Sequence, residues 1–283
     1  MTPAFVDIPW RERSVRIEHA WVGVADEAAG EAEGQAADET ADAEAGAQAP
    51  LIVFLHEGLG SLSMWRDFPE RLCQAAGARG LVWSRPGYGG STPRLPHEAW
   101  APDFMHQQAH EVLPALLQAL GVKRPPWLFG HSDGGSIALL YAARFPVAGA
   151  VVMAPHIRVE ELSVASIDKA RIAYETTELR QRLAKYHDDP DSAFWGWNNI
   201  WLAPEFRAWS IEDEMAAIRC PLLAVQGLDD EYGTLEQIRG IARRVPQTQL
   251  LELPACGHSP HRDQPQAVID AAVAFIHTPG DKP

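Results

Sequence analysis

The stretch that most constrains the fold of this chain is a run of small and polar residues near its middle: Gly130, His131, Ser132, Asp133, Gly134 and Gly135. An apolar run at 127–129 precedes it, and a helix-forming stretch at 136–145 follows it. A serine at Gly-x-Ser-x-Gly spacing between a strand and a helix is the sequence form of a nucleophile elbow. Side chains at Gly130 and Gly134 would clash in so tight a turn, so we expect Ser132 to project from a strained corner. The alternative interpretation is a plain strand–helix turn whose serine caps the helix.

Short apolar runs alternate with helix-forming stretches on both sides of this motif. Strands are expected at residues 14–22, 51–55, 80–84, 127–129, 147–154, 221–226 and 248–253. Helices are expected at 65–76, 103–120, 136–145, 235–245 and 264–277, with a kink at Pro114 in the second of them. Such alternation predicts an α/β fold, in which helices cover both faces of a mostly parallel central sheet.

The strand–helix alternation is interrupted over residues 155–213, which are helical in pattern, polar and rich in tryptophan. We interpret this stretch as a helical lid, or cap, inserted over the carboxyl edge of the sheet, where α/β proteins bind ligands. Residues 1–154 and 214–283 then form one core domain. Within that core, residues 25–49 are rich in Ala, Glu and Gly and predict a solvated acidic loop.

The formal net charge of −14 argues against nucleic acid or an anionic membrane surface as a partner. Most of this charge is local, because residues 25–49 hold eight acids and no lysine or arginine, which leaves −6 for the rest of the chain. The net negative charge therefore reflects the composition of one expected loop and gives little information about the ligand.

Three scattered cysteines, Cys73, Cys220 and Cys256, are too few for a disulfide framework or a zinc cluster. His106 and His110 lie one helical turn apart but lack the glutamate of a His-Glu-x-x-His zinc site. The N-terminus lacks the pattern of a signal peptide, and no apolar run approaches the roughly 18 residues of a membrane span. We therefore expect a cytoplasmic protein that acts on a small-molecule substrate and needs no metal or cofactor. A homo-oligomer is compatible with the sequence.

A serine hydroxyl is a weak nucleophile and needs a neighbouring base, which is itself oriented by an acid. The sequence offers both downstream of Ser132. His258 follows the strand expected at 248–253, and two adjacent acids, Asp229 and Asp230, follow the strand expected before them. The chain therefore contains the three residue types of a Ser-His-Asp triad at the ends of expected strands.

Taken together, these motifs resemble the α/β-hydrolase superfamily, in which the chain order is serine, then acid, then histidine, each at the end of a later strand. The likeness extends over residues 51–276, interrupted only by the lid. It implies that Ser132 is the nucleophile, that Asp230 is the acid and that His258 is the base.

Two neighbours of these residues stay open as alternatives. The family's acid commonly lies three positions after a glycine, here Gly227, which favours Asp230 over Asp229. Asp229 remains an alternative because adjacent residues at a strand end can exchange this role. His261 is the less favoured candidate for the base and is expected to be a loop residue near the site.

The resemblance also implies two backbone donors for an oxyanion. One is the N–H of Asp133, the residue after the nucleophile. The other is the N–H of Gly58, because residues 56–58 resemble the family's His-Gly-x loop. Glu57 departs from that pattern, and a carboxylate beside the hole would repel a developing anion. The alternative is that Glu57 points away and pairs with Arg85 or Arg66.

The expected lid carries the information about the substrate. Six aromatic residues crowd a short part of it: Phe194, Trp195, Trp197, Trp201, Phe206 and Trp209. They predict either an aromatic-lined pocket for a bulky or aromatic acyl group, with Trp197 and Trp201 as binding residues, or simple packing of the lid onto the core. His156 and Arg158 follow the strand at 147–154, where they either face the cleft and bind a substrate carboxylate or cap the strand end.

Three functions fit these features. The first is hydrolysis of a carboxylic ester or thioester through an acyl-enzyme. The second is cleavage of a carbon–carbon bond by the same three residues, as in the meta-cleavage hydrolases of aromatic degradation. The third is a non-catalytic ligand receptor on a hydrolase scaffold, because fold does not determine function. A peptidase acting on an N-terminal residue is disfavoured, since the lid shows no clear acidic pocket for an amine.

Overall fold

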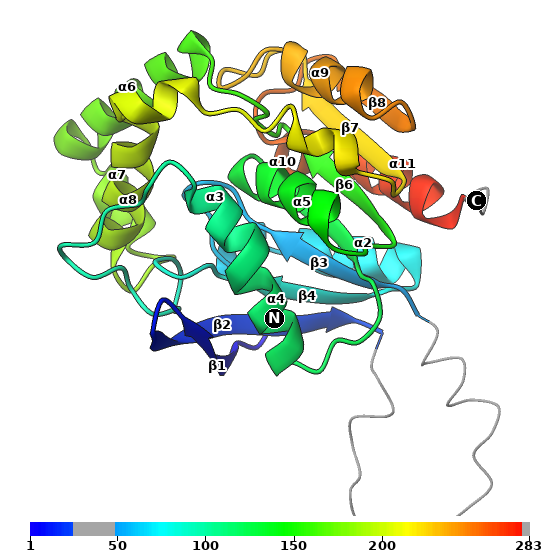
Figure 1. The fold of residues 1–283 in the computed structure, drawn as a ribbon, viewed down its shortest axis with the longest axis horizontal. Helices are drawn as coiled ribbons and strands as arrows, with labels where there is room; N and C mark the ends of the chain where they lie inside the picture. The colour runs from blue at the N-terminus through cyan, green and yellow to red at the C-terminus, as the bar shows by residue number, and fades with distance from the viewer. Residues whose placement is uncertain (25–48, 279–283) are drawn as a thin grey trace, which may run out of the picture.

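The computed structural model describes residues 1–24 and 49–278 of the chain. Its centre is an eight-stranded sheet with the strand order β1-β2-β4-β3-β5-β6-β7-β8 (Figure 1). The strands are β1 (Ala4–Trp10), β2 (Arg13–Gly23), β3 (Leu51–Leu55), β4 (Arg79–Trp83), β5 (Trp127–His131), β6 (Gly149–Met153), β7 (Leu222–Gly227) and β8 (Thr248–Leu253). The β1–β2 and β2–β4 pairs are antiparallel and the other pairs are parallel. The predicted mostly parallel sheet is confirmed.

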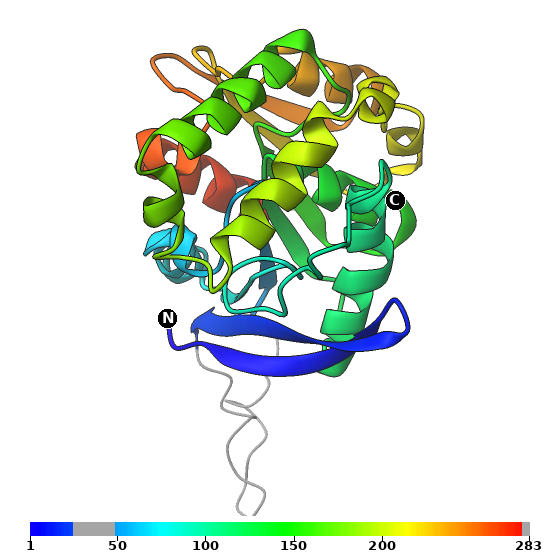
Figure 2. The ribbon, with the colours of Figure 1, turned by 90° about the vertical axis from the view of Figure 1, so that its left-hand side faces the viewer.

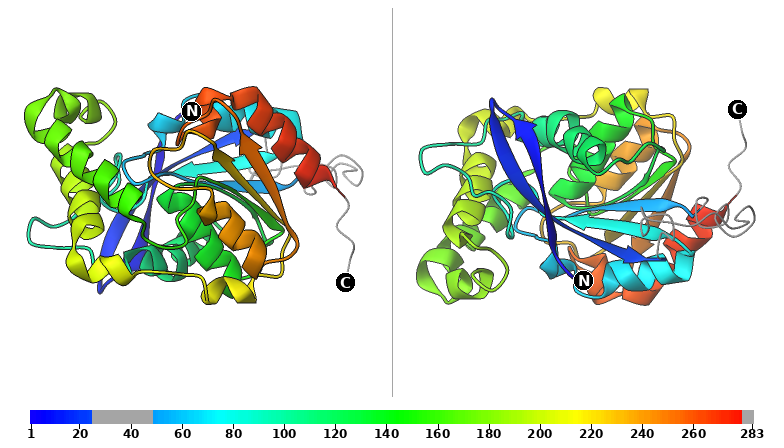
Figure 3. Two further views of the ribbon diagram at one scale, coloured as in Figure 1. Left: turned by 90° about the horizontal axis from the view of Figure 1, so that it is seen from above. Right: turned by 90° about the horizontal axis from the view of Figure 1, so that it is seen from below.

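Helices lie on both faces of this sheet (Figure 3). The α-helices are α2 (Phe68–Ala76), α3 (Phe104–Gln107), α4 (Leu113–Ala119), α5 (Asp133–Arg144), α6 (Glu161–Thr176), α7 (Leu179–Leu183), α8 (Pro190–Leu202), α9 (Glu236–Arg244), α10 (Pro260–Asp263) and α11 (Pro265–His277). Short 3₁₀ turns lie at η2 (Ser63–Trp65), η4 (Pro204–Ala208) and η5 (Glu214–Ala217). Helices α5 and α9 pack on one face, and α2 and α11 pack on the other.

The apolar run of β3 explains why both faces are covered. Val53 and Leu55 belong to the buried cluster under α3, α4 and α5, whereas Ile52 and Phe54 belong to the cluster under α2 and α11. Successive side chains of a strand point to opposite faces, so an unbroken apolar run needs a helical layer on each side. This burial stabilises the centre of the sheet, whose strand ends position the site.

Strand β1 was not predicted from the sequence. It contains Pro9, which lacks the N–H that a central strand needs. The structure accommodates it because β1 is the edge strand and pairs only with β2, with Pro9 opposite Ser14. An edge position leaves one row of backbone groups without a ladder partner, so the missing N–H has little cost there.

The single helix expected over residues 103–120 is wrong in its interior. The chain forms α3, then a π-helical turn at η3 (Gln108–Val112), then α4. Pro114 lies in the first turn of α4 and cannot donate to the carbonyl of His110 four residues earlier. The interruption that Pro114 causes therefore takes the form of a π-helical turn at Gln108–Val112, and not of the simple kink that was predicted.

Residues 155–213 are helical, as predicted, and hold α6, α7 and α8. The two ends of the stretch meet at one isolated bridge between Arg158 and Ser210, where the N–H of Ile211 donates to the carbonyl of Ile157 at 2.8 Å. These helices lie at the end of the sheet to which the parallel strand arrows point, and α8 crosses in front of the strands (Figures 1 and 2). Their role as a lid stays a prediction.

Apart from Ala49, the acidic loop predicted at 25–49 lies outside the described residues. No helix within residues 1–24 and 49–278 combines the length and the apolar character that crossing a bilayer requires.

Candidate active site

The polar segments singled out in the sequence meet at one edge of the sheet, because parallel strands place all their carboxyl ends there. Each follows a different strand: residues 56–58 follow β3, Ser132 follows β5, His156 follows β6, Asp230 follows β7, and His258 follows β8. Residues separated by up to about two hundred positions in sequence are thereby brought to one place by the strand order.

Ser132 occupies the strained corner that its motif predicts. Its backbone has φ 53° and ψ −120°, a region that non-glycine residues rarely adopt. A Cβ at Gly130 would overlap the carbonyl oxygen of Gly134, and a Cβ at Gly134 would overlap the carbonyl oxygen of Leu55. The predicted steric need for both glycines is confirmed.

Ser132, His258 and Asp230 form a continuous chain of hydrogen bonds. Ser132 Oγ lies 2.9 Å from His258 Nε2, and His258 Nδ1 lies 2.8 Å from Asp230 Oδ1. Two backbone N–H groups hold Asp230 Oδ1 from the other side, that of Tyr232 at 2.8 Å and that of Gly233 at 3.2 Å. The carboxylate that contacts the histidine is therefore that of Asp230, while Asp229 is exposed.

The surroundings of this chain favour the charged forms of its acid and base. Burial by itself would raise the pKa of Asp230, but the hydrogen bond from His258 and its charge, with the Tyr232 N–H, lower it below its usual value. Burial would lower the pKa of His258, but Asp230, and then Glu231 and Glu57, raise it. The site therefore stabilises a proton on His258 beside an ionised Asp230.

The two residues predicted to supply oxyanion donors, Gly58 and Asp133, line the same cavity as Ser132. Asp133 is the first residue of α5, so its N–H has no carbonyl four residues earlier within the helix. Gly58 lies in the wall of the same cavity as Ser132, and a Cβ there would overlap the indole of Trp197. The glycine therefore lets the indole pack directly against the loop that follows β3.

Glu57 lines the cavity, and its carboxyl group pairs with neither of the two arginines named in the alternative interpretation. Its Oε2 accepts a hydrogen bond from the N–H of Leu59 at 2.8 Å, and its Oε1 lies 3.9 Å from Arg262 Nη2. Arg85 instead donates to the carbonyl oxygen of Glu57 at 2.8 Å. The alternative pairing with Arg85 or Arg66 is wrong, because the carboxyl group folds back onto its own loop, while Glu57 contributes to the cavity wall.

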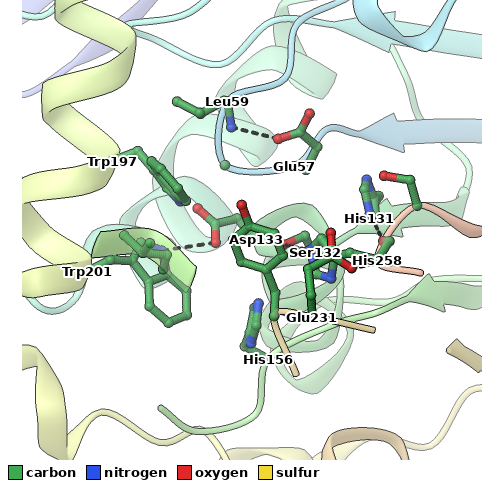
Figure 4. Close-up of a pocket in the computed structure, with 14 residues that line it drawn as sticks. Glu57, Leu59, His131, Ser132, Asp133, His156, Trp197, Trp201, Glu231 and His258 are labelled. Atoms are coloured by element: carbon green, nitrogen blue, oxygen red, sulfur yellow. Dashed lines mark hydrogen bonds between the residues drawn. The ribbon is translucent and has the colours of Figure 1, made fainter. Parts of the chain in front are cut away.

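A cavity of about 170 Å³ opens above Ser132 (Figure 4). Eight residues that the sequence associates with the site line it: Glu57, Gly58, Ser132, Asp133, His156, Trp197, Trp201 and His258. The cavity wall is therefore formed in part by the turn at Ser132, the loop that carries His258, and helix α8.

Residues 52–271 match the model of the Alpha/beta hydrolase family. The chain belongs to this family. It is 26% identical to the sn-1-specific diacylglycerol lipase ABHD11 of Mus musculus, over 80% of this chain and 81% of that protein. It is 24% identical to the 2-hydroxy-6-oxo-6-phenylhexa-2,4-dienoate hydrolase of Burkholderia cepacia, over 75% and 82%. A thermophilic esterase from Thermogutta terrifontis has a similar fold, with a TM-score of 0.69, 19% identity and coverage of 98% and 100%.

Helix α8 of this α/β hydrolase presents two tryptophans to the cavity. Asp189 caps the N-terminus of this helix, since its side chain accepts a hydrogen bond from the N–H of Ser192 at 2.9 Å. Trp197 and Trp201 are four residues apart and therefore lie on one face of the helix. The other two tryptophans named above are not among the residues that line the cavity: Trp195 and Trp209. The four tryptophans of residues 155–213 therefore differ in position: Trp197 and Trp201 line the cavity, and Trp195 and Trp209 do not.

Trp201 also connects helix α8 to Asp133, the residue after Ser132. Its Nε1 donates to Asp133 Oδ1 at 3.2 Å, within a wholly buried contact. Burial raises the pKa of Asp133 to about 6, although Arg85 opposes this shift by its charge. The sequence alone predicts a role only for the backbone N–H of Asp133.

Six further residues line the cavity of the hydrolase and were not predicted: Leu59, His131, Ile167, Glu231, Tyr232 and Ser259. Glu231 and Tyr232 directly follow Asp230, so their place on the same strand-end loop was available as a signal. Ile167 comes from α6, and no sequence pattern separates it from the buried apolar residues around it.

His156 and Arg158 have different positions in the hydrolase. His156 lines the cavity, and burial lowers its pKa to about 3, so its imidazole is neutral. Arg158 lies outside the cavity wall and contacts Glu212 at 3.2 Å and Glu160 at 3.9 Å. The expectation that Arg158 faces the cleft is wrong, because these two carboxylates hold its guanidinium elsewhere.

The other candidate base, His261, contacts His131 rather than Ser132. The His131 and His261 rings lie 4.8 Å apart, and His261 also packs against Trp65. His131 donates from Nε2 to the carbonyl oxygen of His258 at 2.7 Å. The His131 ring thus contacts the backbone of the loop that carries His258, and the His261 ring packs against His131. The side chain of His258 reaches Ser132.

Proposed function

We propose that this α/β hydrolase cleaves a carboxylic ester or thioester through an acyl-enzyme. The observation that carries the proposal is the unbroken hydrogen-bond chain from Ser132 Oγ to His258 at 2.9 Å and from His258 to Asp230 at 2.8 Å. A nucleophile within hydrogen-bond distance of a base that an acid orients is the arrangement that activates a serine hydroxyl.

The proposed mechanism has two halves. Ser132 Oγ attacks the carbonyl carbon while His258 Nε2 takes its proton, and the N–H groups of Gly58 and Asp133 stabilise the oxyanion. Collapse of the tetrahedral intermediate expels the alcohol or thiol, which receives the proton from His258. Water then attacks the acyl-enzyme, His258 again takes and returns a proton, and the carboxylic acid leaves with Ser132 restored. Asp230 keeps the imidazole oriented and stabilises its charged form throughout.

We propose that the acyl group is bulky or aromatic. The rings of Trp197, Trp201 and Tyr232 line the cavity above Ser132, and such rings offer large apolar contact areas. The relative in Mus musculus is named as a lipase for an ester of glycerol, which supports ester hydrolysis over other reactions of this fold.

The relative in Burkholderia cepacia, a dienoate hydrolase by name, supports the alternative of carbon–carbon cleavage. Binding the carboxylate of a dienoate calls for a cationic side chain at the cavity. Arg158, the sequence candidate for this task, pairs with Glu212 and Glu160 instead. The cavity wall therefore favours the ester reaction.

A fluorophosphonate probe tests the proposal directly. It should label the wild-type protein at Ser132 and should leave the Ser132→Ala variant unlabelled, because it needs an activated serine. A panel of p-nitrophenyl esters, compared with a coloured dienoate ring-fission product, then identifies the reaction. Turnover of the dienoate alone would establish the carbon–carbon reaction, and folded protein that is neither labelled nor active would establish a receptor.

The pH dependence of ester hydrolysis should report His258. Only the neutral imidazole takes the serine proton, so kcat/KM should rise with pH, and its midpoint should lie above the ordinary value of 6.5 because the folded pKa is raised. Glu57→Gln and Glu231→Gln should each lower the midpoint, since both carboxylates raise the pKa of His258. Glu161→Gln is the control, because Glu161 pairs with Arg207 outside the cavity. A wild-type midpoint at or below 6.5 would contradict the assignment.

A further inference from the structure

The cavity above Ser132 is lined by acids. Glu57, Asp133 and Glu231 contribute to its wall, and among the described residues that form this wall none is a lysine or arginine. Two guanidinium groups approach the carboxyls from outside it: Arg85 Nη1 is 4.0 Å from Asp133 Oδ2, and Arg262 Nη2 is 3.9 Å from Glu57 Oε1. Both distances exceed those of hydrogen bonds, so two cations partly offset three carboxyl groups.

Aromatic rings share the wall with these acids. Trp197, Trp201 and Tyr232 line the cavity, and the Tyr232 ring lies 4.7 Å from that of His258. The face of an indole or phenol ring attracts a cation, most strongly where water is excluded. Carboxylates beside aromatic faces form the environment that recognises an ammonium group, whereas an anion would meet repulsion from both.

Two buried polar side chains of the wall carry an atom without a hydrogen-bond partner among the described residues. They are Oδ2 of Asp133, a residue 1% exposed, and Nδ1 of His156, a residue 2% exposed. Figure 4 places the Asp133 carboxyl group between the rings of Trp197 and Trp201, with Glu57 on one side and His156 and Glu231 on the other. Buried polar atoms in native proteins are nearly always paired, and a carboxylate oxygen can only accept, so Oδ2 of Asp133 points to a ligand group that donates hydrogen bonds or carries positive charge.

We propose that the hydrolase acts on substrates whose cavity-bound part carries a cationic ammonium group. This inference rests on the proposed ester or thioester hydrolysis and specifies its substrate class. The sequence indicates no clear acidic pocket for an amine in the expected lid. Glu57, Asp133 and Glu231 come instead from the segments that follow β3, β5 and β7.

Three p-nitrophenyl esters of matched shape test this proposal. The cationic ester is the 4-(trimethylammonio)butyrate, its neutral isostere is the 5,5-dimethylhexanoate, and the anionic member is the hemiglutarate. We expect kcat/KM for the cationic ester to exceed that for the isostere about tenfold, and the anionic ester to be the poorest of the three. A cationic-to-neutral ratio below threefold, or a preference for the anionic ester, would overturn the proposal.

Variants show whether the carboxylates cause the preference. Glu57→Gln and Glu231→Gln should each lower the cationic-to-neutral ratio at least threefold, measured on the high-pH plateau where His258 is neutral. Glu161→Gln is the matched control and should leave the ratio unchanged, since this side chain is 90% exposed and outside the cavity. The ratio within each variant cancels any general loss of activity. An unchanged ratio in the double variant Glu57→Gln/Glu231→Gln would overturn the proposal.

The two proposals fail in different ways. Hydrolysis of the neutral ester without a cationic preference leaves the serine hydrolase intact and overturns only the substrate class. If no ester is hydrolysed and the fluorophosphonate leaves Ser132 unlabelled, the proposed function itself is overturned.

Discussion

Replacing Ser132 by alanine should lower kcat for ester hydrolysis about 10⁴-fold or more and leave the fold unchanged. The substitution removes one oxygen atom, the atom that His258 Nε2 contacts at 2.9 Å. Alanine meets the same backbone strain at φ 53° as serine does, so the elbow keeps its shape. The measurements are the rate with a p-nitrophenyl ester, the far-ultraviolet circular dichroism spectrum and the melting temperature.

Ser259→Ala is the matched control for this variant. Ser259 also lines the cavity, but Ser132 is the serine in contact with the imidazole. The control should keep its activity within about threefold of the wild type, as expected for a side chain outside the reacting group. Ser132→Ala protein that retains a tenth of wild-type activity after purification would contradict the proposed nucleophile.

The elbow could be predicted from local rules, and the order of serine, acid and histidine from the resemblance to the α/β hydrolases. Gly130 and Gly134 are required by contacts within the turn and with the adjacent strand end, and the motif records that requirement. Asp230 and His258 follow buried strands, and parallel strands end at one edge. The strand pattern of each segment was therefore enough to predict that Ser132, Asp230 and His258 lie near one another, although it does not show their contacts.

Features that depend on side-chain contacts between distant segments could not be predicted in the same way. Glu57 accepts a hydrogen bond from its own loop and contributes to the cavity wall, whereas the sequence alone suggested Arg85 or Arg66 as its partner. Trp201 bonds to Asp133 across 68 positions, while Trp209 packs nearby without lining the cavity. Each outcome is decided by rotamers and packing, which composition and periodicity do not record.

Asp230→Asn should lower kcat about 10⁴-fold, the loss expected when the histidine of a triad loses its carboxylate. Asp230 Oδ1 accepts from His258 and two backbone N–H groups, while Oδ2 accepts from Gln226 Nε2 at 3.0 Å. An asparagine has only one acceptor oxygen. Its NH₂ group, which donates, must therefore face either the Gln226 donor or the donors that contact Oδ1, and the hydrogen bonds on that side are lost. The charge that raises the pKa of His258 is also lost, so the midpoint of the pH profile should fall.

Asp229→Asn is the control that separates the two adjacent acids. Asp229 is exposed, and its backbone N–H donates to the carbonyl of Cys256 at 2.9 Å, a bond that the substitution keeps. The variant should retain activity within about twofold of the wild type and keep its pH midpoint. The reverse pattern, a large loss at Asp229 with activity preserved in Asp230→Asn, would assign the acid to Asp229. Equal circular dichroism spectra for the two variants are needed to attribute either loss to the reaction, because both changes lie on one strand-end loop.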